Sequence, residues 1–169
     1  HEVIHRRIIE ALGGEVVGTV QNHHNFAWRV PQTDGTPIFV HRKGATPAAR
    51  GDVGIVPGSM ATPGFFVTGL GETAVNILSH PALNSASHGS GRTLGRRQAQ
   101  RELDRTKVKA KLAASGVKLL GGGIDEAPDA YKDSREVIAA QSDLIEVWAE
   151  FQPAIVRMDS GGKHSLVER

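Results

Sequence analysis

Residues 51–70, GDVGIVPGSMATPGFFVTGL, contain two short apolar runs on either side of a Pro-Gly pair. Both runs are rich in Val, Ile and Phe, which favour strands, and Pro57-Gly58 favours a type II turn. The glycine of such a turn adopts a positive φ, which glycine tolerates without a steric clash. The stretch therefore predicts two strands joined by a turn, and it establishes the β part of the fold.

Further elements are expected on both sides of this stretch. Apolar patterns predict strands over 15–20, 37–41, 116–123 and 153–158, and helical spacing predicts helices over 1–12, 93–114 and 134–151. Asp133 and Glu136 suit the N-cap and N3 positions of the last helix. Strands and helices follow no strict βαβ order, so the expected class is α+β, with mixed sheets flanked by helices. The last helix is expected to bury Val137, Ile138, Leu144, Ile145 and Trp148.

The composition is that of an ordinary globular chain without cysteine. Its 169 residues suffice for one core, and the absence of cysteine excludes disulfides and thiolate metal sites within the chain. The 20 Lys and Arg nearly balance the 18 Asp and Glu, so nucleic-acid binding depends on where the cations cluster. No apolar run approaches the roughly 20 residues of a membrane span, and no signal-peptide pattern opens the chain. A cytoplasmic protein is expected, with no membrane partner.

Residues 1–169 are expected to form a single domain or a fragment of a longer protein. The chain begins at His1 within an expected helix, which indicates either a fragment or a removed methionine. Residues 159–169 are polar and contain two glycines, so they are expected to form a mobile tail.

Two histidine-containing segments supply candidate ligands. His23-His24-Asn25 places adjacent imidazoles at a strand end, and only one of them can face a site because neighbouring side chains alternate. The plain alternative is one surface and one core histidine. His41-Arg42-Lys43 ends another strand before Gly44, and this cluster suits phosphate contacts unless it is a solvated strand end.

Two glycine-containing segments suit the binding of a phosphate. The turn at Pro57–Met60 can present successive N–H groups to an anion, with the Ser59 hydroxyl beside them, although plain turns are common. In SHGSGR, residues 87–92, the glycines permit close approach of a bound group and Arg92 can neutralise a phosphate. His88 can accept a phosphoryl group on its imidazole, unless it is incidental to a glycine loop.

Five separated segments together resemble the RtcB-type RNA ligases. The segments are HHN (23–25), HRKGA (41–45), GIVPGSM (54–60), SHGSGR (87–92) and IDEAPDAYKDSREVIAAQSDLIEV (124–147). They occur in the order and approximate spacing of that family, over roughly residues 15–158. Agreement of all five in order is far more specific than any one of them.

The resemblance implies a GTP- and manganese-dependent ligase, active in tRNA splicing or RNA repair. It would join RNA ends carrying a 3′-phosphate or 2′,3′-cyclic phosphate to 5′-hydroxyl ends, through a guanylyl-histidine intermediate on His88. His24 would bind manganese, of which the complete enzyme holds two ions, and an archease-type activator is an expected partner. The implied guanylate-binding residues are His24, Asn25, Pro57, Gly58, Ser59, Met60, Gly89, Ser90, Gly91, Arg92 and Tyr131.

The chain also departs from the family. Family members are longer and place further metal ligands upstream of the matched region. Gly64 replaces a serine, and neither Arg157 nor Lys163 matches the family's C-terminal lysine. Arg96-Arg97 and the cluster of Lys107, Lys109 and Lys111 are candidate RNA contacts, and the lysine cluster can equally be a solvated helix face. Two other functions stay open: a nucleotide- or RNA-binding module without catalysis, and a metal-dependent phosphoesterase.

Overall fold

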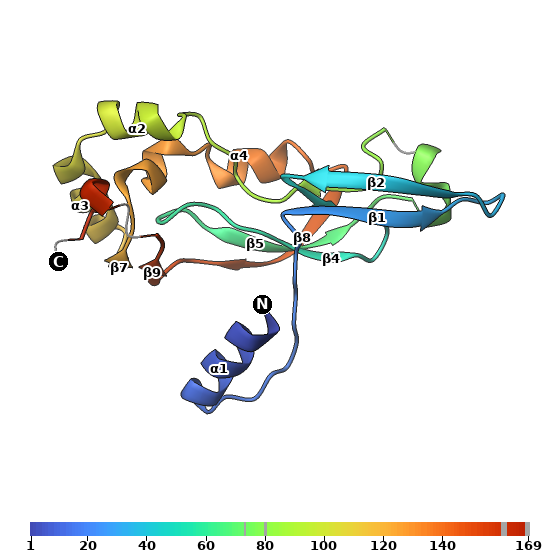
Figure 1. Ribbon diagram of the computed structural model, residues 1–169, viewed down its shortest axis with the longest axis horizontal. Coiled ribbons are helices and arrows are strands. Elements are labelled where there is room, and N and C mark those ends of the chain that lie inside the picture. Colours follow the sequence, from blue (N-terminus) through green and yellow to red (C-terminus); the bar gives the residue numbers. More distant parts are fainter. Residues whose placement is uncertain (73, 80, 160–161, 168–169) are drawn as a thin grey trace.

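The computed structural model describes residues 1–72, 74–79, 81–159 and 162–167. Helices and strands form an elongated molecule (Figure 1), which confirms the expected α+β class. The α-helices are α1 (Glu2–Leu12), α2 (Arg96–Glu102), α3 (Arg105–Ala114) and α4 (Ser134–Ala139). The strands are β1 (Asn25–Pro31), β2 (Pro37–Lys43), β3 (Ala45–Pro47), β4 (Val53–Val56), β5 (Gly64–Gly69), β6 (Ser85–Ser87), β7 (Lys118–Gly121), β8 (Ile145–Phe151) and β9 (Ile155–Arg157). Short 3-10 helices are η1 (Ala74–Ser79), η2 (Ile124–Glu126), η3 (Pro128–Ala130) and η4 (Gly162–His164).

The described strands form four small sheets. The largest is antiparallel in the order β4-β5-β8, and β1-β2 and β3-β6 are antiparallel pairs. β7 and β9 pair in parallel. Within the largest sheet, Val56 lies opposite Phe65 and Val53 opposite Thr68, so the two strands expected from residues 51–70 are confirmed.

The connection between these two strands differs from the predicted type II turn. Gly58 is not among the described glycines with positive φ, so that turn prediction is wrong. Instead the Ser59 N–H donates to Thr62 Oγ1 at 2.7 Å, and the loop folds back on itself. A Cβ at position 58 would overlap the Pro63 carbonyl oxygen, so the glycine is needed for close packing and not for its φ angle.

The predicted helix over 134–151 is wrong beyond Ala139. α4 is capped as expected, since the Asp133 carboxylate accepts from the N–H groups of Arg135 and Glu136. The following residues then form β8, which pairs with β5. Ile145 is buried, but Trp148 is 57% exposed and stacks on Phe66 at 5.2 Å. The expected inward position of Trp148 is therefore wrong, because a strand faces its side chains differently from a helix.

Two other element predictions are corrected, and some elements were not predicted. The helix expected over 93–114 is two helices, because Asp104 caps α3 by accepting from the N–H groups of Thr106 and Lys107. No strand forms over 15–20, where Val17 is 98% exposed. The strand partner of β2 is β1, which the sequence analysis did not predict. The sequence analysis also did not predict η1 and β6, which lie between β5 and α2, while Thr73 and His80 lie outside the described residues.

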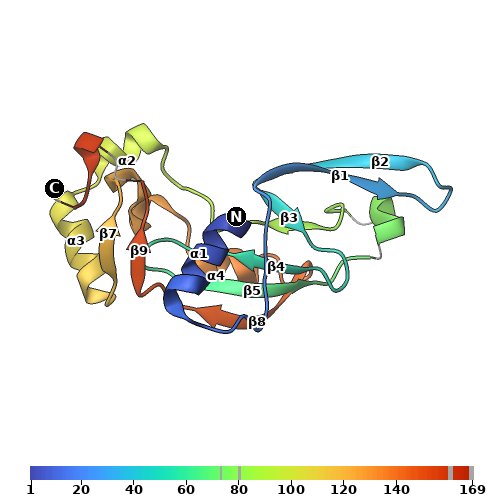
Figure 2. The same cartoon turned by 60° about the horizontal axis from the view of Figure 1, so that its bottom comes forward.

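The expected mobile tail is also wrong for its described part. Leu166 is 1% exposed and packs in a core cluster with Met60, Val108 and Leu112. Its N–H donates to the Gly122 carbonyl at 2.8 Å. This cluster holds α3 against β7 at one end of the molecule, whereas the β1-β2 hairpin projects at the other end (Figures 1 and 2). Among the described residues, no helix combines the length and apolar character of a membrane span.

Candidate functional site

His24 and His88 lie together where three chain segments meet. Their ring centroids are 4.5 Å apart, and the rings are in edge contact at 69°. Gly44 joins the two segments: its N–H donates to the His24 carbonyl at 3.1 Å, and its own carbonyl accepts from the His88 N–H at 3.3 Å. Gly44 has φ +73°, a conformation that glycine adopts without strain. The chain thus brings together two of the histidines singled out from the sequence.

The two imidazoles face a cavity of about 340 Å³. Pro57 and Ile55 form part of its wall, and Asn22 is fixed there because its amide donates to the Ile55 carbonyl at 2.6 Å. His5 of α1 and its N-cap residue His1 also line the cavity. The cavity is large enough for part of a nucleotide and offers several ring nitrogens as polar contacts.

The environment of His88 favours the neutral imidazole. Partial burial lowers its pKa, and the neighbouring His24 lowers the pKa further, while the Gly44 backbone opposes the shift. A neutral imidazole keeps the nitrogen lone pair that a nucleophile requires. His88 is therefore suited to attack an electrophilic phosphorus.

The Pro57 turn and the glycine loop that follows His88 pack against each other. The Ser90 N–H donates to the Pro57 carbonyl at 3.1 Å, and the Ser90 hydroxyl contacts the same carbonyl at 3.4 Å. Gly91 has φ +71°, and Gly89 lies so close to Pro57 that a Cβ would touch its carbonyl at 3.4 Å. The structure thus unites two segments, about 30 residues apart in sequence, that were separately considered for phosphate binding.

Other residues of the Pro57–Met60 segment point into the protein. Met60 is 2% exposed and belongs to the core cluster around α3. The Ser59 hydroxyl accepts from Thr62 Oγ1 at 2.9 Å. Any contact of Met60 with a nucleotide therefore involves its backbone, whereas Ser59 retains its own hydroxyl proton for donation.

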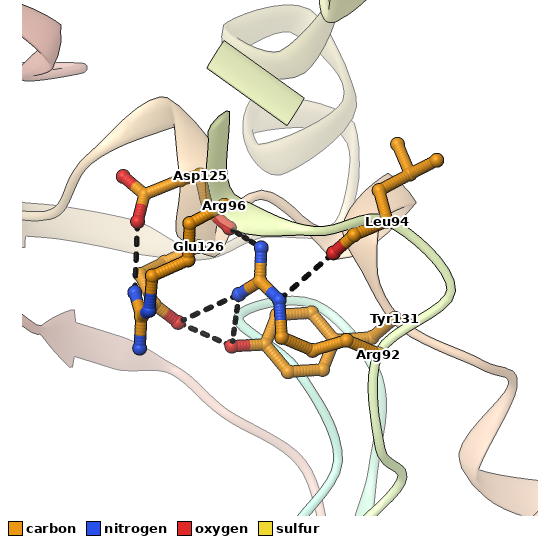
Figure 3. Close-up of polar contacts among 6 residues, drawn as sticks. All are labelled: Arg92, Leu94, Arg96, Asp125, Glu126 and Tyr131. Atoms are coloured by element: carbon orange, nitrogen blue, oxygen red, sulfur yellow. Dashed lines mark hydrogen bonds and ion pairs between the residues drawn. The ribbon is translucent and has the colours of Figure 1, made fainter. Parts of the chain in front are cut away.

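Arg92 and Tyr131 are held together by a polar network (Figure 3). Arg92 Nε donates to the Leu94 carbonyl at 3.0 Å, and its terminal nitrogens donate to Tyr131 Oη at 3.1 Å and to the Asp125 carbonyl at 2.5 Å. The guanidinium carbon also lies 4.9 Å from the Tyr131 ring centroid. Arg92 therefore orients Tyr131, and a phosphate would compete with these partners for its donors.

Two buried carboxylates complete this network and were not identified from the sequence. Glu126 accepts from the Tyr131 hydroxyl and from Arg96, and Asp125 accepts from Arg96 Nη1 at 2.8 Å. Both carboxylates are only 8% exposed. Burial and the hydrogen bond to Glu126 raise the pKa of Tyr131, which keeps the phenol protonated. In the sequence, the available signal was a pair of adjacent acids between Ile124 and Ala127, because carboxylates in an apolar segment need partners if that segment is buried.

Gln141 was also missed from the sequence. It is buried, and its carbonyl oxygen accepts from the Ser87 N–H at 2.8 Å, one residue before His88. Its Nε2 is buried without a hydrogen-bond partner among the described residues. Gln141 thus anchors the strand that ends at the candidate nucleophile.

In the basic segment His41-Arg42-Lys43, Arg42 is buried and has a structural role, whereas its two neighbours lie on the surface. Arg42 is 5% exposed and donates to Ser85 Oγ at 2.8 Å and to the Leu83 and Asn84 carbonyls. Burial lowers its pKa, which Asp52 partly offsets. His41 and Lys43 are exposed, and His41 Nε2 lies 2.6 Å from Asn25 Oδ1. Successive side chains of a strand point to opposite faces, so Arg42 of β2 points into the protein while His41 and Lys43 point outward.

The remaining sequence-derived candidates occupy separate positions. His23 precedes β1 and stacks on Phe26 with ring centroids 4.9 Å apart, and it is not among the residues that line the cavity of His24 and His88. Among the described residues, no group of three or more His, Asp or Glu side chains could hold a metal ion. Gly64, where the resembling family has serine, lies against Phe151, whose Cε1 would be 2.7 Å from a Cβ.

Comparisons with known proteins identify the family of the chain. The family model described as tRNA-splicing ligase RtcB matches residues 1–159. The chain is 40% identical over 125 residues to the RNA-splicing ligase RtcB of Escherichia coli strain K12. This match covers 74% of the present chain and 29% of the relative. It is 32% identical over 177 residues to the tRNA-splicing ligase RtcB of Nanoarchaeum equitans, covering 92% of this chain and 36% of the relative. The chain thus spans about a third of the length of these relatives. It belongs to the RtcB family of tRNA-splicing ligases.

Proposed function

We propose that this chain is the guanylate-accepting part of a GTP-dependent RNA ligase, with His88 as the residue that takes up GMP. The observation that carries the proposal is the His24–His88 pair in one cavity, beside the packed Pro57 and Gly89–Gly91 loops. The glycine loop allows close approach of phosphate oxygens, and its glycine N–H groups are the proposed donors to them. The Ser59 and Ser90 N–H groups already donate to Thr62 Oγ1 and to the Pro57 carbonyl. The membership of the chain in the RtcB family supports the same assignment.

In the proposed first step, an imidazole nitrogen of His88 attacks the α-phosphorus of GTP. A P–N bond forms, the bond to the leaving pyrophosphate breaks, and the imidazole proton passes to solvent. GMP is then transferred to the 3′-phosphate of RNA, and His88 returns to its free state. The 5′-hydroxyl of the second RNA end attacks that phosphate and displaces GMP, which leaves a joined strand. A phosphoramidate suits this sequence because it is both easily made and easily broken.

Tyr131 is proposed to lie beside the guanine. The Arg92 guanidinium and Glu126 fix its ring and hydroxyl, so the ring is preorganised before a nucleotide binds. Preorganisation reduces the entropy that binding would otherwise cost. Asn25 and Ser59 are proposed to provide further polar contacts to the bound nucleotide. Ser90 is buried, with its N–H and hydroxyl directed at the Pro57 carbonyl, and is proposed to hold the two loops together.

Manganese belongs to the proposed chemistry, but the described residues do not form a complete site for it. His24 is the candidate ligand, and no group of three His, Asp or Glu side chains within the described part of the chain could hold an ion. One imidazole offers too few donors for tight binding. Titration of the 169-residue chain with manganese by calorimetry is therefore expected to show no submicromolar site. Tight binding would contradict the view that further ligands come from outside this chain.

The proposed reaction is tested in a chimera in which this chain replaces the matched segment of the Escherichia coli relative. The chimera is incubated with manganese and with GTP labelled at the α-phosphate. Label on the protein that is labile to acid and stable to base is expected, because that is the behaviour of a phosphoramidate. Release of phosphate without labelled protein would favour a phosphoesterase, and retained GTP without either product would favour a binding module.

A further inference from the structure

The outer face of the β1-β2 hairpin is exposed along its whole length. Side chains alternate along each strand, and one face carries the buried residues Val30, Val40 and Arg42. All residues of the opposite face are exposed. This outer face consists of the register pairs Asn25–Lys43, Ala27–His41, Arg29–Phe39 and Pro31–Pro37.

The chemistry of the outer face matches a single-stranded nucleic acid. Phe39 is 70% exposed and lies directly opposite Arg29, and Lys43 and His41 follow at alternate positions of β2. No acidic residue occupies any position of this face. Exposed aromatic rings between cations are the means by which proteins hold single strands, through base stacking and phosphate contacts. A protein partner is disfavoured, because Phe39 is the only large apolar side chain on the face.

The outer face begins at the candidate site. Lys43 precedes Gly44, whose backbone binds those of both His24 and His88. Asn25, the residue after His24, contacts His41 across the hairpin at 2.6 Å. From this base the hairpin runs to one end of the molecule (Figures 1 and 2), where its inner face packs on Ile77 of η1. A strand lying on the outer face would therefore lead toward His88.

We propose that the outer face of the β1-β2 hairpin binds the RNA strand whose end is presented to His88, with a base stacked on Phe39 and phosphates contacting Arg29 and Lys43. The inference rests on the proposed function, since it assigns a path to the RNA substrate of that site. The ligand class is single-stranded RNA, recognised through its bases as stacking surfaces and not through their sequence.

Binding is measured by fluorescence anisotropy on the 169-residue chain, without GTP or manganese, using a labelled single-stranded RNA of about ten nucleotides with a 3′-phosphate. Phe39→Leu, which keeps an apolar side chain but removes the ring, is expected to weaken binding about 5- to 100-fold, whereas Phe39→Trp should retain it. Arg29→Ala should lower the slope of log affinity against log salt by about 0.7, the share of one phosphate contact in a single strand. Lys118→Ala, which removes an exposed cation of β7 at the other end of the molecule, is the matched control and should leave affinity unchanged.

The inference is overturned if the wild-type chain does not bind the RNA, if Phe39→Leu binds like the wild type, or if Lys118→Ala loses as much affinity as Arg29→Ala. Because Phe39 is exposed, Phe39→Leu is expected to fold normally, which thermal unfolding verifies. The chimera separates this inference from the proposed function. Guanylylation with hairpin-independent RNA binding refutes the RNA path alone, whereas hairpin-dependent RNA binding without guanylylation refutes the proposed function alone.

Discussion

Replacing His88 with alanine is expected to abolish GMP labelling of the chimeric ligase, with a loss of at least about 1000-fold in rate. His88 is the one side chain of the SHGSGR loop whose phosphorus adduct is both formed and broken readily, because serine esters at Ser87 or Ser90 would be more inert. Its neighbours in that loop also have structural partners: the Ser87 hydroxyl donates to the Gly89 carbonyl at 2.6 Å, and Ser90 is buried against Pro57. Labelling with GTP radioactive at the α-phosphate measures the effect.

The loss must come from chemistry and not from unfolding. His88 follows the end of β6 and is only half-buried, so the His88→Ala chain should unfold within about 1 kcal/mol of the wild type. His80→Ala is the matched control; His80 lies outside the described residues and outside the SHGSGR motif, and this variant should keep the label. Normal labelling of His88→Ala would refute the assignment, and mass mapping should then examine His80 and His23 first.

Replacing Leu166 with alanine is expected to destabilise the chain by about 2–5 kcal/mol. The residue is 1% exposed and packs on the cluster that contains Met60, Val108 and Leu112. Truncation leaves a cavity there that the surrounding helix and strand can fill only in part. Urea unfolding of the wild-type and Leu166→Ala chains measures this difference in the free energy of unfolding, from the two midpoint concentrations and a common m-value.

Leu120→Ala is the control for the Leu166 variant. Leu120 belongs to β7 in the same part of the molecule but is 44% exposed, so its truncation should cost less than about 1 kcal/mol. Equal effects of the two substitutions would show that the segment 162–167 does not close the core. Because Met60 shares the cluster, the Leu166 variant should also loosen the Pro57–Met60 segment next to His88.

Several features of the fold were predictable because their causes are local. Alternating apolar residues specified β2, β4 and β5, and the Asp133 carboxylate specified the start of α4 through backbone N–H groups only two and three residues away. Gly13 ends α1 in the left-handed conformation, as expected of a glycine in that position. The candidate residues His24 and His88 came from motif order, and the structure places their rings in contact.

The remaining features depended on partners distant in the sequence. IEVWAEF became β8 because β5, about 80 residues earlier, offers it a free edge, although the preceding residues favour a helix. Arg42 is buried because the carbonyls of Leu83 and Asn84 accept hydrogen bonds from its guanidinium. The sequence near residue 42 gives no indication of these distant partners. A pattern read along the chain contains no information on such pairings.

By itself, the sequence determined the class of the fold, the Asp133 cap of α4 and the family motifs, since each follows from residues within a few positions or from motif order. Only the tertiary structure decided that Arg92 is engaged by Tyr131 and the Asp125 backbone, and that Leu166 completes a core. The physical reason is that burial and hydrogen-bond satisfaction are properties of three-dimensional neighbours. A cation in a glycine loop or a leucine in a polar tail acquires its role from groups that meet it only when the chain folds.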